Sequence, residues 1–208
     1  MEFHETEFGI VPNGWGFKRV GELCQSVSNK HSFNKSKLIF LNTGDIEDNR
    51  FLHANYSDVA TMPGQAKKTI QKGDILYSEI RPINKHYAFV NFSAEDYVVS
   101  TKLMVIRSTQ IAPRRLFHFL TLKETILELQ MQAESRSGTF PQIRFDNISR
   151  LPILIAPPEI ENRFNVFLDK FYNKIESNIV ENQRLAELRD ILLPRLMSGE
   201  LDVSELDI

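Results

Sequence analysis

The chain has 208 residues, 42% of them hydrophobic and 25% charged, which is the composition of an ordinary globular protein with one sizeable core and an appendage. Cys24 is the only cysteine, which excludes an intrachain disulfide and a zinc site built from thiolates. The sequence begins MEFHETEF and contains no run of about 18 apolar residues, so we expect no membrane association and a cytoplasmic protein.

The net charge of -2 hides an asymmetry between the two parts of the chain. Residues 1–150 carry 19 Lys and Arg against 16 Asp and Glu, whereas residues 151–208 carry 6 against 11. The front is therefore mildly basic and the tail acidic. A surplus this small does not by itself indicate nucleic-acid binding, so that inference needs cations clustered in space.

The first third of the chain predicts short strands. Trp15, Phe17 and Val20 alternate with polar residues, which indicates a strand with one buried face and Trp15 as a core anchor. The apolar run 38–41 predicts a second strand. Residues 46–61 show no regular pattern, and we expect a loop there.

A turn at 62–68 carries the adjacent cations Lys67 and Lys68. A strand follows at 75–77, and because Pro82 cannot donate a ladder hydrogen bond, the chain should leave the sheet near Arg81 and project a polar loop. Strands are expected again over 87–92 and 97–106, the second interrupted by Ser100, Thr101 and Lys102.

Pro113 begins a predicted helix that reaches about Ala133, followed by a hydroxyl-rich loop over 135–142. A short helical turn at 143–148 and a buried strand at 151–155 complete the domain. The sequence thus predicts an α/β (α+β) globular domain over residues 1–156.

The last quarter predicts one long helix over 157–197, followed by an acidic tail over 198–208. Pro157 and Pro158 precede 35 residues, 159–193, without Pro or Gly. At 1.5 Å per residue this stretch is about 52 Å long, more than the diameter of a domain of this size. We expect part of the helix to be covered by another protein, although a helix folded onto its own domain remains an alternative.

Apolar residues recur along this helix at alternating spacings of four and three, and Asn residues occupy the middle of the row. A buried Asn fixes the register and the number of partners at a cost in stability, so the pattern favours a coiled-coil dimer interface. The predicted interface residues are Phe164, Leu168, Phe171, Ile175, Asn178, Asn182, Leu185, Leu188 and Leu192.

Catalytic motifs are missing from the sequence. It contains no GxGxxG, no Walker loop, no GxSxG elbow and no histidine pair at metal-binding spacing. Asp74, Glu79 and Lys85 come nearest to a nuclease set, but Glu79 is followed by Ile80 and Arg81, whereas such a site has any residue and then Lys. We therefore expect a non-catalytic protein without cofactor or metal.

Several loops concentrate groups that bind phosphates or base edges. Arg bonds guanine bidentately, Asn and Gln do the same to adenine, and Lys suits phosphates. Polar loops are also often only solvated, and that interpretation stays open for each. The candidate DNA-binding residues are Lys67, Lys68, Arg81, Asn84, Lys85, His86, Lys102, Arg136, Ser137, Thr139, Gln142 and Arg144.

Four stretches, in this order, resemble the DNA specificity subunit of type I restriction-modification systems. They are the opening 6–15, followed by Val-Gly-Glu-Leu at 20–23; Gly-Asp-Ile-Leu and the Arg-bearing loop at 73–81; the boundary at 151–158; and the ending around LLPRLMSGEL at 185–201. One departure is Asn162-Arg163-Phe164, where the family commonly has Gln and then Ile. The helix is unaffected by it.

The resemblance implies a subunit that recognises double-stranded DNA without cutting or methylating it. It also implies long helices that separate two recognition domains and dock methyltransferase (M) subunits, with the restriction (R) subunit joining through the complex. This chain carries one recognition domain and one helix, as a half-subunit or as a fragment. We expect a homodimer with antiparallel helices that reads a bipartite site. A coiled-coil scaffold with a protein-binding domain is the alternative.

Overall fold

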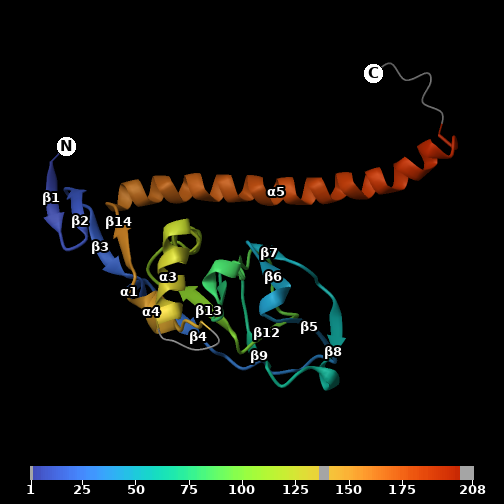
Figure 1. Ribbon diagram of the computed structural model, residues 1–208, viewed down its shortest axis with the longest axis horizontal. Helices are drawn as coiled ribbons and strands as arrows, with labels where there is room; N and C mark the ends of the chain where they lie inside the picture. Colours follow the sequence, from blue (N-terminus) through green and yellow to red (C-terminus); the bar gives the residue numbers. More distant parts are fainter. Residues whose placement is uncertain (1, 136–140, 202–208) are drawn as a thin grey trace, which may run out of the picture. The chain divides into compact units, whose positions relative to one another are not determined.

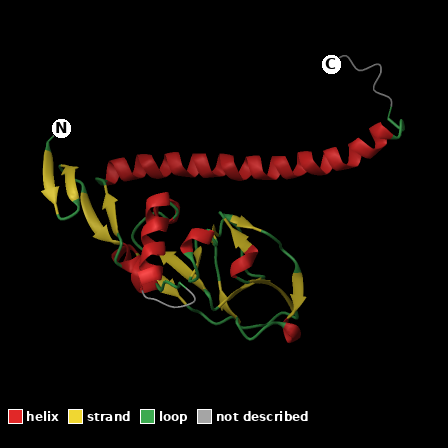
Figure 2. Ribbon diagram, viewed as in Figure 1, coloured by secondary structure: helices red, strands yellow, loops and turns green. Residues whose placement is uncertain are grey.

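The computed structural model describes residues 2–135 and 141–201. The chain divides into two compact units, Met1–Asn162 and Arg163–Ile208, and the division falls inside the long helix α5 (Pro158–Met197). Figure 2 shows that strands and short helices make up the first unit, whereas the second is helical. A mixed α and β domain followed by a long helix was predicted; the domain boundary at residue 157 remains a prediction.

The first unit contains fourteen strands, four α-helices and three short 3-10 helices among the described residues (Figure 1). In chain order they are β1 (Phe3–Thr6), β2 (Gly9–Pro12), β3 (Gly16–Arg19), α1 (Val20–Leu23), β4 (Cys24–Val27), β5 (Lys37–Leu41), η1 (Thr43–Asp45), β6 (Ile46–Glu47), β7 (Arg50–Phe51), β8 (Tyr56–Asp58), η2 (Val59–Thr61), β9 (Ala66–Thr69), β10 (Ile75–Ser78), η3 (Pro82–Asn84), β11 (Tyr87–Phe89), β12 (Tyr97–Ser100), β13 (Leu103–Ser108), α2 (Pro113–Leu120), α3 (Lys123–Ser135), α4 (Phe145–Ser149) and β14 (Pro152–Ile155).

Two four-stranded sheets form the centre of this unit. One has the order β11-β10-β13-β4 and is antiparallel throughout. The other has the order β8-β5-β12-β9, with β5 and β12 parallel and the outer pairs antiparallel. Strands β12 and β13 are separated by Thr101 and Lys102 alone, so this turn carries the chain from one sheet to the other.

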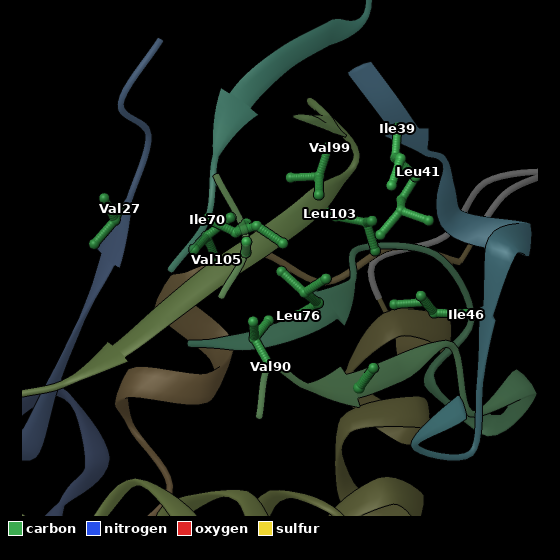
Figure 3. Close-up of a cluster of buried hydrophobic side chains, with 12 residues drawn as sticks. Val27, Ile39, Leu41, Ile46, Ile70, Leu76, Val90, Val99, Leu103 and Val105 are labelled. Carbon is green, nitrogen blue, oxygen red and sulfur yellow. The ribbon is translucent and has the colours of Figure 1, made fainter. Parts of the chain in front are cut away.

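The main core is a cluster of buried side chains contributed by both sheets (Figure 3). Ile39 and Leu41 of β5 belong to it, whereas Leu38 belongs to a smaller cluster with Ala66 and Val98. This is the alternation expected of a strand whose two faces are both covered. Leu76 and Val105 of the other sheet belong to the same cluster as Ile39 and Leu41.

Helix α2 covers the opposite face of the first sheet with aromatic contacts. Tyr77 of β10 stacks on Tyr87 of β11 at 5.7 Å between ring centroids. Phe117 of α2 lies 6.0 Å from Tyr87 and 5.6 Å from Phe89. Burial raises the pKa of the Tyr77 hydroxyl well above its usual value, so this group stays neutral.

A buried ion pair ties the start of β10 to β13. Asp74 is fully buried and accepts two hydrogen bonds from Arg107, at 2.7 and 2.8 Å. The Gln71 backbone N–H donates to the same carboxylate at 2.8 Å. Asp74 therefore has a structural role, which removes it from the nuclease set considered above.

Three predictions from the sequence need correction. Residues 46–61 are not a plain loop, because β6, β7, β8 and η2 lie there. The single helix over 113–133 is two helices, because the Thr121 hydroxyl bonds the carbonyls of Phe117 and His118 and ends α2. Trp15 is only half-buried and is no core anchor.

Helix α5 runs unbroken over 40 residues, about 60 Å, as predicted. Glu159 and Glu161 lie in its first turn, where the helix dipole favours carboxylates. Pro194 is accommodated inside the helix, which bends towards its C-terminal end in Figure 1. Met197 is the last helical residue, which agrees with the predicted end.

Candidate nucleic-acid interface

The segment that leaves β10 is held between two other loops. The Glu79 N–H donates to the Lys102 carbonyl at 3.1 Å, and the Glu79 carbonyl accepts from Ile143 at 2.8 Å. The Arg81 N–H donates to the Pro141 carbonyl at 3.1 Å. Three segments that are far apart in sequence, each with candidate residues, therefore converge.

Arg81 begins a tight turn with a left-handed backbone. Its φ is 42° and that of Lys85 is 57°, values that cost free energy for a residue other than glycine. Hydrogen bonds from Asn84 to the Arg81 carbonyl, at 2.9 Å, and from Lys85 to Pro82, at 3.0 Å, stabilise the turn. The exposed Arg81 side chain is thus presented on a constrained backbone. Strand β10 ends at Ser78, so the chain leaves the sheet near Arg81, as Pro82 predicted.

Lys68 was predicted to lie in a turn. It lies instead in strand β9. Its ammonium donates to the carbonyls of Thr101 at 3.0 Å and Leu103 at 2.7 Å. Burial lowers its pKa and Lys102 adds to the effect, while Glu79 opposes it. Lys68 therefore stabilises the turn between the two sheets, which weakens the prediction that it contacts phosphate.

Lys67, which precedes Lys68, and Lys102, which follows the Thr101 carbonyl that Lys68 contacts, keep exposed side chains. The Lys102 ammonium lies 3.7 Å from the Glu79 carboxylate, an ion pair that water screens. Lys30 joins this group through a β-bridge with Lys68. The sequence placed Lys30 in an unassigned polar segment, and only the fold brings it here.

Lys85 and His86 contact a different part of the domain. The Lys85 ammonium lies 3.7 Å from Asp48, and His86 Nδ1 lies 2.8 Å from the Ile46 carbonyl. Both partners belong to β6 and the turn that follows it. These two candidates therefore support the loop rather than joining the Arg81 and Lys102 group, while Asn84, which precedes them, is exposed.

The hydroxyl-rich loop over 135–142 contains several of the candidate residues. Arg136, Ser137 and Thr139 lie outside the described residues. Gln142 forms a β-bridge with Ile80 and is exposed. Arg144 is exposed as well, and its N–H donates to Asn147 at 3.0 Å at the start of α4. The described end of this loop therefore adjoins the Arg81 turn.

We call the cations on these converging segments the cationic cluster. It comprises the exposed Lys30, Lys67, Arg81, Lys102 and Arg144 and the partly buried Lys68. Glu79 is the carboxylate within it. Such an arrangement attracts polyanions, and the amide of Gln142 adds base-edge chemistry. Among the described residues, no group of three or more His, Cys, Asp or Glu is placed to hold a metal ion.

The candidate interface residues of α5 differ in exposure. Leu168 is 2% exposed, and Phe164 and Ile175 are half-buried. Phe171, Leu185, Leu188 and Leu192 are exposed, as are Asn178 and Asn182. The C-terminal half of the row thus offers apolar side chains that the chain itself leaves uncovered.

A strict heptad count refines this row. One heptad position is occupied by Phe164, Phe171, Asn178, Leu185 and Leu192. The other is occupied by Leu168, Ile175, Asn182, Arg189 and Leu196. Leu188 falls beside the row, and Leu196, which was not among the candidates, lies in it. We call these ten residues the seam.

The first turn of α5 belongs to the first unit and is held there by a hydrogen bond and an ion pair of Glu161. Glu161 accepts from the Ala156 N–H at 3.0 Å, and its other oxygen lies 3.5 Å from Arg115 Nε. Arg115 also donates to the Leu154 carbonyl at 2.9 Å. Burial lowers the Arg115 pKa and Glu161 counteracts it. No local sequence pattern indicates this pair, because its two residues lie on different elements, α2 and α5.

Comparison with known proteins places these features in context. Residues 12–188 match the model of the family described as type I restriction modification DNA specificity domain. Over 181 residues, the chain is 44% identical to the type I restriction enzyme HindI specificity subunit of Haemophilus influenzae, covering 86% of this chain and 39% of that protein. Over 203 residues it is 23% identical to the MjaIX specificity subunit of Methanocaldococcus jannaschii, covering 94% and 46%.

Solved structures show the same fold at low identity. The HsdS subunit from Thermoanaerobacter tengcongensis aligns with a TM-score of 0.67 and 19% identity, covering 98% of this chain and 53% of that one. A chain from a study of the assembly of the type I R-M system aligns with a TM-score of 0.65 and 18% identity, covering 95% and 52%. The chain spans about half the length of each of these proteins.

Proposed function

The chain belongs to the family of type I restriction-modification DNA specificity domains, and we propose that it is a non-catalytic subunit that reads one half of a DNA target. The cationic cluster carries this proposal. It brings together Lys67, Arg81 and Lys102 from three segments, and clustered cations with polar neighbours suit contacts to phosphates and base edges.

We further propose that two copies pair through α5 as an antiparallel homodimer. The exposed part of the seam supports this, because Leu185 and Leu192 need a cover that the chain does not supply. Twofold symmetry would duplicate the recognition domain and produce a bipartite site with symmetric halves. The spacer between the halves would follow from the length of α5.

The proposed partners are double-stranded DNA, methyltransferase subunits docked on the helices, and a restriction subunit joined through that complex. The proposed location is the cytoplasm, where such a complex meets DNA. Among the described residues, no helix is long and apolar enough to cross a membrane.

The experiment is to purify the chain together with methyltransferase subunits and map the sites that the complex methylates. We expect a two-part palindromic sequence. In the same complex, Arg81→Ala should weaken binding to that target by about tenfold to a hundredfold, because a bidentate contact to a base contributes about 1–3 kcal/mol. Binding to unrelated DNA should change little.

Arg50→Ala is the matched control, since it removes an exposed Arg that pairs with Glu47 outside the cationic cluster. Equal losses for every DNA sequence would make Arg81 a phosphate contact. A complex that binds no DNA would favour the alternative of an assembly scaffold.

A further inference from the structure

Charged side chains are sorted along α5. Relative to the seam, Arg163, Lys170 and Arg184 share one heptad position, and Lys174 and Arg195 share the neighbouring position on the same side. All five are exposed. We call this side the basic flank. Glu181 shares the heptad position of Lys174 and Arg195, and Glu159 lies near the flank, but the five cations leave it with a positive balance.

The other side of the seam carries the opposite charge. Asp169, Glu176 and Asp190 share one heptad position there, and Glu187 lies near it. This acidic flank contains no Lys or Arg between Pro158 and Met197. A helix that only needed solubility would intersperse both signs, so the separation calls for an explanation.

Symmetry determines where these flanks go in a pair. In a parallel pair the twofold axis runs along the helices, so each face of the pair would combine one basic and one acidic flank. In an antiparallel pair the axis crosses the helices, and the two basic flanks fall on the same face. Antiparallel pairing therefore gives one basic face and one acidic face.

We propose that the basic face of the antiparallel pair binds the phosphates of the spacer DNA between the two half-sites. This inference rests on the homodimer proposed above. Chain connectivity attaches one recognition domain to the N-terminal end of each helix, so a duplex held by both domains is tethered at both ends of the pair. The surface would contact DNA without reading its sequence.

Dimensions and charge both fit this partner. Arg163 and Arg184 are separated by about 31 Å along the helix, the length of roughly nine base pairs. Antiparallel pairing also brings the basic flanks of the two copies close together. Their positive charges repel each other, and the phosphates of a DNA duplex would neutralise this repulsion.

The experiment measures how binding depends on salt in the complex with methyltransferase subunits. The probe is a duplex with two half-sites and its spacer, compared with a scrambled duplex of equal length. Lys170→Gln combined with Lys174→Gln removes two cations per copy. Because each phosphate contact contributes about 0.9 to the slope of log K against log salt, we expect the slope to fall by about 2–4.

Lys72→Gln combined with Lys123→Gln is the matched control, with the same loss of charge at exposed sites of the recognition domain. Its slope should stay near that of the unaltered protein. Preference for the target over the scrambled duplex should survive in both variants, because the basic flank reads no bases.

The outcomes distinguish failure of this inference from failure of the proposed function. An unchanged slope in the Lys170 and Lys174 variant, with target preference intact, overturns the inference and leaves the proposed function standing. A smaller slope on both duplexes, without target preference in the unaltered protein, supports the basic face and refutes sequence recognition. If the unaltered complex binds neither duplex, both proposals fall.

Discussion

The recognition domain and the long helix use apolar residues in opposite ways. In the domain, strands β10 and β13 place Ile75, Leu76, Val105 and Ile106 at 0% exposure between partners from the same chain. In α5, Leu168 is the buried residue, and Phe171, Leu185 and Leu192 are at least 41% exposed. The domain buries its apolar residues within its own core, whereas the helix leaves apolar residues exposed, as the proposed pairing with a second copy would require.

This difference implies two kinds of stability. The domain should unfold at a denaturant concentration independent of protein concentration, because its contacts are internal. The helix should respond to concentration, because a partner that binds only the folded form stabilises it by mass action. Substitutions in the domain should therefore change its free energy of unfolding, whereas substitutions in α5 should change the association of the helix.

The largest expected effect lies in the domain, at the buried pair of Asp74 and Arg107. Asp74→Ala leaves the Arg107 guanidinium without its carboxylate, which should lower the free energy of unfolding by about 3–5 kcal/mol. Urea unfolding of the purified chain measures the loss.

Asp58→Ala serves as the control, because its pair with Lys37 is 4.0 Å long and 63% exposed on both sides. We expect a change below about 1 kcal/mol there. Similar losses for the two variants would show that the Asp74 pair is not the internal tie described above.

The next effect belongs to the helix. Leu185→Asp would place a charge in the seam, so the dissociation constant of the proposed homodimer should rise at least a hundredfold, about 3 kcal/mol. Sedimentation equilibrium measures this constant, and the urea transition of the domain should not move.

Val180→Asp is the matched control on α5, because Val180 is 68% exposed and faces away from the seam. If both substitutions weakened association equally, the heptad assignment would be refuted.

A smaller effect, of opposite sign, is expected in the middle of the seam. Asn182→Leu should tighten pairing by roughly tenfold, about 1.4 kcal/mol, and allow further oligomeric states, because a seam Asn sacrifices stability for register. Gln183→Leu, one position outside the seam, should leave both properties unchanged. Dissociation constants and mass distributions from sedimentation test this, and an unaltered Asn182→Leu variant would place that residue outside the interface.

The sequence predicted the features that depend on local pattern. A double proline followed by an uninterrupted run without Pro or Gly indicated α5, and short apolar runs indicated β5 and β10. It failed where a short polar element gains its structure from distant partners. Strand β8, Tyr56–Asp58, is exposed throughout and pairs with β5, and nothing in its own residues indicates a strand.

The candidate site was predictable in residue type but not in role. Arg81 could be found because proline breaks a strand beside it. Lys67 and Lys68 look equivalent in sequence, yet strand alternation exposes one and directs the other to the carbonyls of Thr101 and Leu103. Lys30 was missed because its β-bridge to Lys68 spans 38 positions of sequence.

The smallest expected effect tests this difference between the two lysines. Lys67→Gln should reduce the salt slope of DNA binding by about 1 per copy and leave the unfolding free energy unchanged, because the side chain is exposed and suited to a single phosphate. Lys68→Gln should instead cost about 1 kcal/mol of stability, because the amide cannot replace both hydrogen bonds to backbone carbonyls. Salt titrations and urea unfolding on the same two variants separate the effects. If Lys68→Gln changed only the salt slope, Lys68 would contact DNA after all, and the tie between the two sheets would have to come from backbone pairing alone.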